Sequence, residues 1–183
     1  MDPDRELVEA AAGGSRDAFD ELVRRHQAAI VTLAQVLTSG RGDPEDIAQE
    51  VFVRAWRSLR TFRGESLFRT WLHRVAINVV RTSQTRRGRW TRLFTSDSEE
   101  GVPEQANGEE PLDAVLARRQ VIDRAMATLP EDLRIAVTLR DLQGLDYRDI
   151  ADALGVPVGT VESRIFRARQ KLKPLLAPLL KRR

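Results

Sequence analysis

The sequence contains no cysteine and only two histidines, which excludes a disulfide framework, a thiolate metal site and a histidine-rich metal centre. Aromatic residues make up 5% of the chain, and no apolar run approaches the roughly 20 residues that a membrane-spanning helix needs. The acidic start, MDPDRELVE, lacks the features of a signal peptide. No alternating strand pattern and no internal repeat is present. These absences predict a cytoplasmic, all-α protein that needs no cofactor or metal and does not insert into a membrane.

What the sequence does contain is charge, and the two signs are segregated along the chain. The net charge is only +3, but residues 66–95 hold seven arginines and no acidic residue. Residues 96–113 hold seven acidic residues and no Lys or Arg, and their Gly, Pro, Asn and Ser content predicts a flexible linker. Such a basic stretch is typical of proteins that bind nucleic acid, whereas a surface built for solubility mixes the signs. We therefore expect a domain over residues 1–95, an acidic linker over 96–113 and a second domain over 114–183.

The stretch from residue 146 to residue 174 predicts a helix-turn-helix. Gly155 and Pro157 end its first helix, because glycine tolerates a positive φ and proline removes a helical donor. The second helix carries apolar residues at steps of four, three and four, namely Val161, Ile165, Ala168 and Leu172. Its other faces carry hydroxyl and basic side chains, which suits a helix lying in the DNA major groove. An ordinary amphipathic helical hairpin with a solvated basic face is the alternative.

Three long helices are predicted in the N-terminal domain. The first runs over about residues 17–38 and places His26 within its apolar stripe, as a core or boundary histidine. The second begins with Asp43 as its cap and a proline at the first helical position. Capping does not account for Gln49 and Glu50, which continue a polar face beside the apolar one. This polar face is either solvated or a docking surface.

The third helix runs over about residues 67–85 and follows a loop with a turn at Gly64. Trp71 and several arginines lie on or beside its apolar face, and five arginines surround Trp90 toward and beyond its end. Arginines next to aromatic rings suit single-stranded nucleic acid, because bases stack on rings and on guanidinium planes. Core packing is the alternative explanation for Trp71, because large aromatic side chains are mostly buried.

Four motifs in order cover nearly the whole chain: DPEDIAQEVFVRAW, FRGESLFRTWLHRVAINVV, LPEDLRIAVTLRDLQGLDYRDIADALG and PVGTVESRIFRARQKL. With a linker between the second and the third, they resemble the extracytoplasmic-function sigma factors of bacterial RNA polymerase, in particular the envelope-stress sigma-E type. The resemblance implies two small helical domains, sigma region 2 over residues 1–95 and sigma region 4 over residues 114–183, joined by the flexible acidic linker. It also implies a transcription initiation factor for a stress-type regulon, and no enzymatic activity.

The resemblance assigns roles to individual residues as well. DPEDIAQE is similar to the segment that docks on the clamp helices of core polymerase, which implies polymerase contacts by Asp46, Gln49 and Glu50. The loop FRGESLF and the helix after it resemble the element that captures the single-stranded −10 sequence, which implies DNA contacts by Phe62, Phe68, Trp71, Arg74, Asn78 and Arg81. The second helix of the helix-turn-helix resembles the reader of the duplex −35 element, which implies contacts by Thr160, Glu162, Ser163, Arg164, Phe166, Arg167 and Lys171.

Glu162 departs from this pattern, because it stands where the family pattern has arginine. A carboxylate repels phosphate and guanine edges but can accept a hydrogen bond from cytosine N4, so we expect the −35 sequence to differ at one position. The partners that the resemblance implies are core RNA polymerase, through its clamp helices and flap, promoter DNA, and an anti-sigma factor, membrane-anchored or otherwise.

Two other functional classes account for less of the sequence. A stand-alone helix-turn-helix repressor or activator explains residues 114–183 but leaves DPEDIAQE without a role. It predicts a dimer on a palindromic site, bound without polymerase. An enzyme acting on nucleic acid needs metal carboxylates or a nucleophile–base pair, whereas the acidic residues of this chain cluster in a helix cap and a linker.

Overall fold

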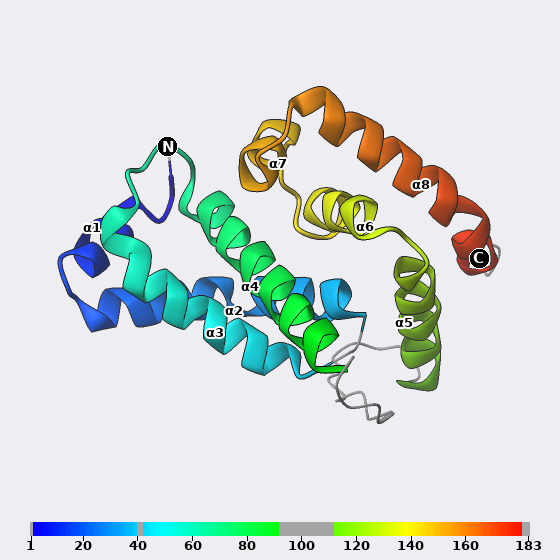
Figure 1. Ribbon diagram of the computed structural model, residues 1–183, viewed down its shortest axis with the longest axis horizontal. Helices are drawn as coiled ribbons and strands as arrows, with labels where there is room; N and C mark the ends of the chain where they lie inside the picture. Colours follow the sequence, from blue (N-terminus) through cyan, green and yellow to red (C-terminus); the bar gives the residue numbers. More distant parts are fainter. Residues whose placement is uncertain (1, 40–41, 92–111, 181–183) are drawn as a thin grey trace.

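The computed structural model describes residues 2–39, 42–91 and 112–180, and every regular element within these ranges is helical (Figure 1). The N-terminal half contains α1 (Arg5–Ala12), α2 (Arg16–Thr38), α3 (Pro44–Ser58), the short 3₁₀ helix η1 (Leu59–Thr61) and α4 (Phe68–Thr91). The C-terminal half contains α5 (Leu112–Ala127), α6 (Glu131–Val137), the π-helical turn η2 (Thr138–Leu142), α7 (Tyr147–Leu154) and α8 (Val158–Leu180). The predicted all-α fold is confirmed. Most of the predicted acidic linker and the side chain of Trp90 lie outside the described residues.

Short acidic side chains fix where two of these helices begin. Asp43 Oδ1 accepts a hydrogen bond from the Glu45 N–H at 2.8 Å, and Pro44 is the first residue of α3. Asp146 caps α7 in the same manner, accepting from the Asp149 N–H at 2.8 Å. Each bond satisfies an N–H group that has no partner inside its helix. The predicted cap of α3 is confirmed.

The N-terminal half is a small bundle in which α2, α3 and α4 pack on one another. Leu22, Val51 and Leu72, one from each helix, are fully buried in its core. Burying a side chain of this size stabilises the fold by about 1.5–3 kcal/mol. α1 packs against α2 and buries Val8 and Ala11, although the sequence does not predict this helix. Its eight residues form little more than two turns and leave only a short apolar pattern.

α7 and α8 form the predicted helix-turn-helix. Gly155 ends α7 with φ 66°, in the left-handed region that glycine adopts without steric cost. Val161, Ile165 and Ala168 of α8 are buried as the sequence pattern predicts, and α6 packs across the same side of α8. The opposite face of α8 is exposed and carries its polar side chains.

The two halves of the chain pack against each other, which the sequence does not predict. α7 lies against α4 (Figure 1). α5, α6 and η2 each contact α2. One hydrophobic cluster includes Phe68 and Leu72 of α4 together with Ile150 of α7 and Val161 of α8. The helix-turn-helix is therefore held against the third long helix of the N-terminal half.

Candidate functional site

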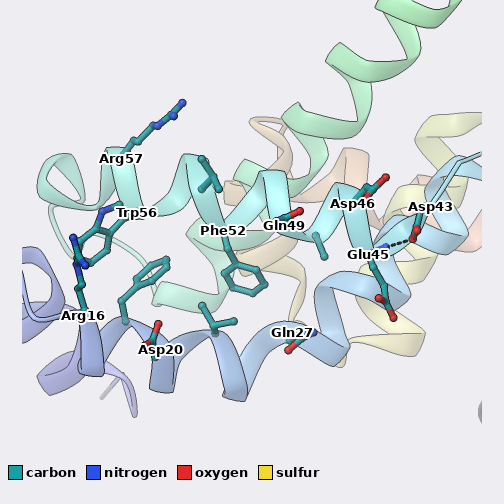
Figure 2. Close-up of a pocket in the computed structure, with 14 residues that line it drawn as sticks. Arg16, Asp20, Gln27, Asp43, Glu45, Asp46, Gln49, Phe52, Trp56 and Arg57 are labelled. Carbon is teal, nitrogen blue, oxygen red and sulfur yellow. Dashed lines mark hydrogen bonds between the residues drawn. The ribbon is translucent and has the colours of Figure 1, made fainter.

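A groove of about 780 Å³ runs between α2 and α3. Phe19, Phe52 and Trp56 form its apolar floor, and the rings of Phe19 and Trp56 pack at 4.9 Å between centroids. Figure 2 shows Arg16 and Arg57 at the end near Trp56. Apolar rings between charged ends suit contact with another protein, because they offer area to bury and charges to fix orientation.

The opposite end of this groove is acidic. Asp43, the cap of α3, lines it together with Glu45 and Asp46 of α3, and Asp46 points outward from the helix (Figure 2). Gln49 also lines the groove, so two of the three residues predicted to contact polymerase lie there. The third, Glu50, is exposed on α3 outside the lining and pairs with Arg54, with 2.6 Å between Oε1 and Nε.

A second, smaller pocket of about 410 Å³ lies beside the loop before α4. Its lining includes Phe62, Trp71 and Arg74 together with loop residues 63, 65 and 66. The rings of Phe62 and Trp71 are 5.1 Å apart between centroids and tilted by 41°. Two aromatic rings and a guanidinium at the mouth of a pocket are the groups on which an unstacked base binds.

Phe68 does not line this pocket, contrary to its predicted role in DNA binding. It is 0% exposed and packs beneath Trp71 and Phe62, at 5.7 and 6.3 Å between ring centroids. A side chain covered in this way supports the pocket and cannot contact a base in this conformation. The sequence shows an aromatic residue near a loop, but not which of the neighbouring rings covers the others.

The other residues predicted to contact the −10 strand lie along one face of α4. Trp71, Arg74, Asn78 and Arg81 are spaced by three, four and three, which aligns them along a helix. Asn78 is exposed. Arg81 Nε lies 3.3 Å from Glu131 Oε1 of α6, so its guanidinium reaches the C-terminal half.

Polar contacts from α7 cover part of this face. Asp149 Oδ1 accepts a hydrogen bond from Thr70 Oγ1 at 3.0 Å, and its other carboxylate oxygen lies 3.4 Å from Arg69 Nη2. Arg74 donates to the backbone carbonyl of Asp152, and Asp152 also lines the smaller pocket. The helix-turn-helix thus forms one wall of the pocket.

His73 lies buried on α4 at 3% exposure, and its Nδ1 is 2.5 Å from the Arg69 carbonyl oxygen. Burial lowers the pKa of His73 below its usual value, and the bond to the Arg69 carbonyl opposes that shift only in part. The nearby charges of His26 and Arg69 lower the pKa of His73 further. The folded chain therefore favours neutral His73.

We expect the free energy of unfolding to fall as the pH drops below 6.5, the ordinary pKa of histidine. Above that pH the imidazole is neutral in both states, whereas below it the unfolded chain binds a proton that the folded chain resists. Urea unfolding at about pH 7.5 and about pH 5.5 measures the loss. The His73→Phe variant keeps a ring and should lose less stability on acidification. Equal losses in both proteins would remove His73 as the cause.

The exposed face of α8 carries most of the residues predicted to contact the −35 element. Phe166 is 63% exposed, and Glu162, Ser163, Arg167 and Lys171 are exposed as well. Such a row of exposed side chains on the second helix suits insertion into the major groove. Thr160, at the start of α8, is half-buried.

Arg164 is predicted to contact DNA, but in this structure its side chain points toward α6. Its Nε lies 3.3 Å from Asp132 Oδ2 of α6, and its side chain is only 20% exposed. The pair joins α8 to α6, so in this conformation Arg164 holds the two helices together. This pairing could not be predicted from the sequence, because Asp132 is 32 residues away in the chain.

Within the described residues, no helix is both long and apolar enough to cross a membrane. The same part of the chain has no group of three or more His, Asp or Glu side chains placed to hold a metal ion. The features that the described residues do offer are an apolar groove with charged ends, an aromatic pocket and a helix-turn-helix.

Comparison with known proteins agrees with this arrangement. Two family models match: Sigma-70 region 2 over residues 22–91, and Sigma-70 region 4 over residues 119–172. The "ECF RNA polymerase sigma-E factor" of Escherichia coli K12 is 39% identical over 98% of this chain and 97% of its own. The "RNA polymerase sigma-H factor" of Pseudomonas aeruginosa is 41% identical over 99% of this chain and 97% of its own.

Two solved structures are also similar. CnrH in complex with the cytosolic domain of CnrY matches with a TM-score of 0.72 and 32% identity, over 97% of this chain and 99% of that one. The sigma factor RpoE in complex with the anti-sigma factor NepR, from Bartonella quintana, matches with a TM-score of 0.71 and 26% identity, over 87% of this chain and 96% of that one. The chain belongs to the extracytoplasmic-function family of RNA polymerase sigma factors.

Proposed function

We propose that this chain docks on core RNA polymerase through α3, captures the −10 strand at the pocket beside α4 and reads the −35 duplex with α8. The observation that carries the proposal is the presence, on one sigma-family chain, of three surfaces with three different chemistries. The protein directs polymerase to the promoters of a stress-type regulon and acts in the cytoplasm as an initiation factor. It carries out no reaction of its own.

The docking surface is the outer side of α3 together with the groove between α2 and α3. Asp46, Gln49 and Glu50 lie within about one turn of one another and are exposed. Their carboxylates and amide would accept hydrogen bonds from basic side chains of the clamp helices. Phe52 and Trp56 in the groove would supply apolar area, which gives such a contact more affinity than rim charges alone.

The −10 surface combines a pocket with a helix face. A base flipped out of the stack would enter the pocket that Phe62 and Trp71 line, with the Arg74 guanidinium beside it. Flipping costs a few kcal/mol, which stacking and hydrogen bonds in a pocket repay. Asn78 lies one turn further along α4, where its amide can hydrogen-bond to the edge of a base.

Replacing Asn78 with alanine is expected to slow open-complex formation while leaving the affinity for core polymerase unchanged. Asn78 is exposed on α4, so the substitution should not disturb the core. Losing a hydrogen bond to a base edge costs about 1–3 kcal/mol, which is about 5- to 150-fold in rate. Permanganate reactivity of the −10 strand measures the opening. Thr32→Ala is the control, because Thr32 is exposed on α2 and its hydroxyl bonds the Ala28 carbonyl of its own helix. Wild-type reactivity in Asn78→Ala would remove this residue from the −10 surface.

The −35 surface is the exposed face of α8. Arg167 and Lys171 are one turn apart, so they can hold a base edge and a phosphate of the same groove. Glu162 faces solvent on this helix and would accept from cytosine N4, so we expect a preference for cytosine at one −35 position, where an arginine would favour guanine. Arg164 can join these contacts only if it leaves Asp132.

Because the two halves of the chain pack together, the −10 and −35 surfaces are closer to each other than the two promoter elements are. The −10 and −35 elements lie about 25 base pairs apart, which is roughly 85 Å of duplex. A compact chain of this length has a radius of gyration of about 16 Å. We infer that this structure is a closed form in which α7 covers the −10 surface, and that promoter recognition requires α7 to leave α4.

An anti-sigma factor is a further partner that we propose. The two solved structures described above are complexes, one with the cytosolic domain of CnrY and the other with the anti-sigma factor NepR. An inhibitor that holds α4 and α7 together would keep the −10 surface covered and would prevent the separation that promoter recognition requires. Binding only the closed form would stabilise it by mass action.

The experiment that tests the proposed function mixes the purified chain with core polymerase and footprints a library of random duplex fragments. The expected footprint covers two elements, and it requires both proteins. A stand-alone transcription factor would instead protect a palindrome as a dimer without polymerase, which would overturn the proposal.

A further inference from the structure

The first residues of the chain hold the start of α4, although 66 positions separate them in sequence. Asp2 Oδ2 accepts a hydrogen bond from the Phe68 N–H at 2.7 Å, and Phe68 is the first residue of α4. The other oxygen of the same carboxylate accepts from the Asp4 N–H at 3.0 Å. A carboxylate at a helix start satisfies an N–H group and complements the helix dipole. Asp2 therefore acts as an N-terminal cap for α4 from outside that helix.

Asp4 anchors this N-terminal segment to α2. It is 4% exposed, and its two carboxylate oxygens lie 2.8 Å from His26 Nε2 and 3.0 Å from Arg25 Nη1. Two partners hold this buried carboxylate in one position. If either contact breaks, a buried polar group is left without a partner, which costs free energy. Residues 2–4 thus form a strap with one end fixed on α2 and the other on α4.

The strap meets the ring cluster beneath the −10 pocket. The His26 ring packs edge-on against the Phe68 ring at 5.4 Å, and Phe68 supports Trp71 and Phe62. A residue that fixes the Phe68 backbone therefore also fixes the rings that line the pocket. None of Asp2, Asp4 and His26 lines the pocket itself.

We propose that residues 2–4 are a positioning strap for capture of the −10 base, with Asp2 holding the start of α4 and Asp4 holding the strap to α2. The inference rests on the proposed function of the pocket. When the strap is detached, the first turn of α4 opens more often, and the pocket is assembled in a smaller fraction of molecules. Apparent affinity for the −10 strand falls in proportion to that fraction.

The test uses the full chain in holoenzyme with core polymerase, with permanganate reactivity of the −10 strand as the readout. Asp2→Leu removes the acceptors and keeps a branched side chain of similar size. It should slow strand opening about 2- to 30-fold, the range that loss of one helix cap produces, without changing the affinity for core polymerase. Asp2→Asn keeps an oxygen acceptor and should restore most of the rate.

The matched control is Ser15→Ala, because Ser15 Oγ caps α2 by accepting from the Ala18 N–H at 3.3 Å. This variant loses a cap in the same half of the chain, away from the −10 pocket. Because the first turn of α2 lines the docking groove, the comparison is made at saturating core polymerase, where Ser15→Ala should open promoters at the wild-type rate. Hydrogen exchange of the amides of residues 68–71 should be faster in Asp2→Leu alone.

Wild-type opening and exchange in Asp2→Leu would overturn the strap, and so would an equal slowing in Ser15→Ala. Absence of opening by the unmodified holoenzyme would instead count against the proposed function, so the two failures can be told apart.

Discussion

Replacing Asp46 and Glu50 with arginine is expected to abolish co-purification of the chain with core RNA polymerase. Both side chains are exposed on α3, so the double substitution should leave the fold and its circular dichroism unchanged. Placing two positive charges opposite a basic partner costs several kcal/mol, since like charges face each other across an interface. The lost ion pair between Glu50 and Arg54 is worth only about 0.3–0.5 kcal/mol, because it is an exposed pair on one helix.

The control for this experiment carries the same change of charge elsewhere. Glu6 and Glu9 are exposed on α1 and line neither the groove nor the smaller pocket. Replacing both with arginine should leave co-purification intact. Retained binding by the α3 variant would remove α3 as the docking surface. Equal loss in both variants would mean that net charge, and not this surface, governs the interaction.

Replacing Asp149 with arginine is expected to open the closed form. The Asp149 side chain accepts from buried Thr70 and lies beside Arg69, so the substitution removes a hydrogen bond and places two cations together. Leaving one partner of a buried hydrogen bond unsatisfied costs about 1–3 kcal/mol, which moves the equilibrium about 5- to 150-fold toward separated halves. The cap of α7 is retained, because Asp146 accepts from the backbone N–H of residue 149.

Small-angle X-ray scattering measures this change as an increase in the radius of gyration of the isolated chain. The charge swap Asp149→Arg with Arg69→Asp restores opposite charges and should restore the compact form. Open molecules should also bind a single-stranded −10 oligonucleotide more tightly, because α7 no longer covers the −10 surface. Unchanged scattering in the single variant, or no recovery in the swap, would contradict the proposed role of this contact.

Local sequence patterns predicted the parts of the fold that depend on neighbouring residues. Asp43 with Pro44 marked the start of α3, and Gly155 with the apolar stripe of α8 marked the helix-turn-helix. Caps, turns and helical stripes are decided within a few residues, so they can be read without the tertiary structure. The resemblance to sigma factors then predicted the family, which the relatives confirm.

Contacts between distant residues could not be predicted in the same way. The strap joins Asp2 to Phe68, and the closed form joins Thr70 to Asp149, over 66 and 79 positions. No periodicity connects such positions, because the fold alone brings them together. The same reason explains why the sequence does not predict the burial of Phe68 beneath the other rings or the pairing of Arg164 with α6.

In this account, promoter binding needs both halves of the chain, because each half carries one of the two DNA-reading surfaces. The proposed −10 pocket and −35 helix would each make only a few specific contacts, and neither is expected to hold a promoter tightly alone. Once polymerase fixes their separation, binding by one half raises the effective concentration of the other. The closed form would keep the isolated protein from occupying DNA before it meets polymerase.

The most direct measurement is transcription in vitro from a fragment selected by the holoenzyme, with core polymerase, the chain and nucleotides as the only other components. We expect a transcript with one defined start downstream of the protected −10 and −35 elements, and none when either protein is omitted. A chain that binds duplex DNA alone but yields no transcript with core polymerase would contradict its assignment as a sigma factor.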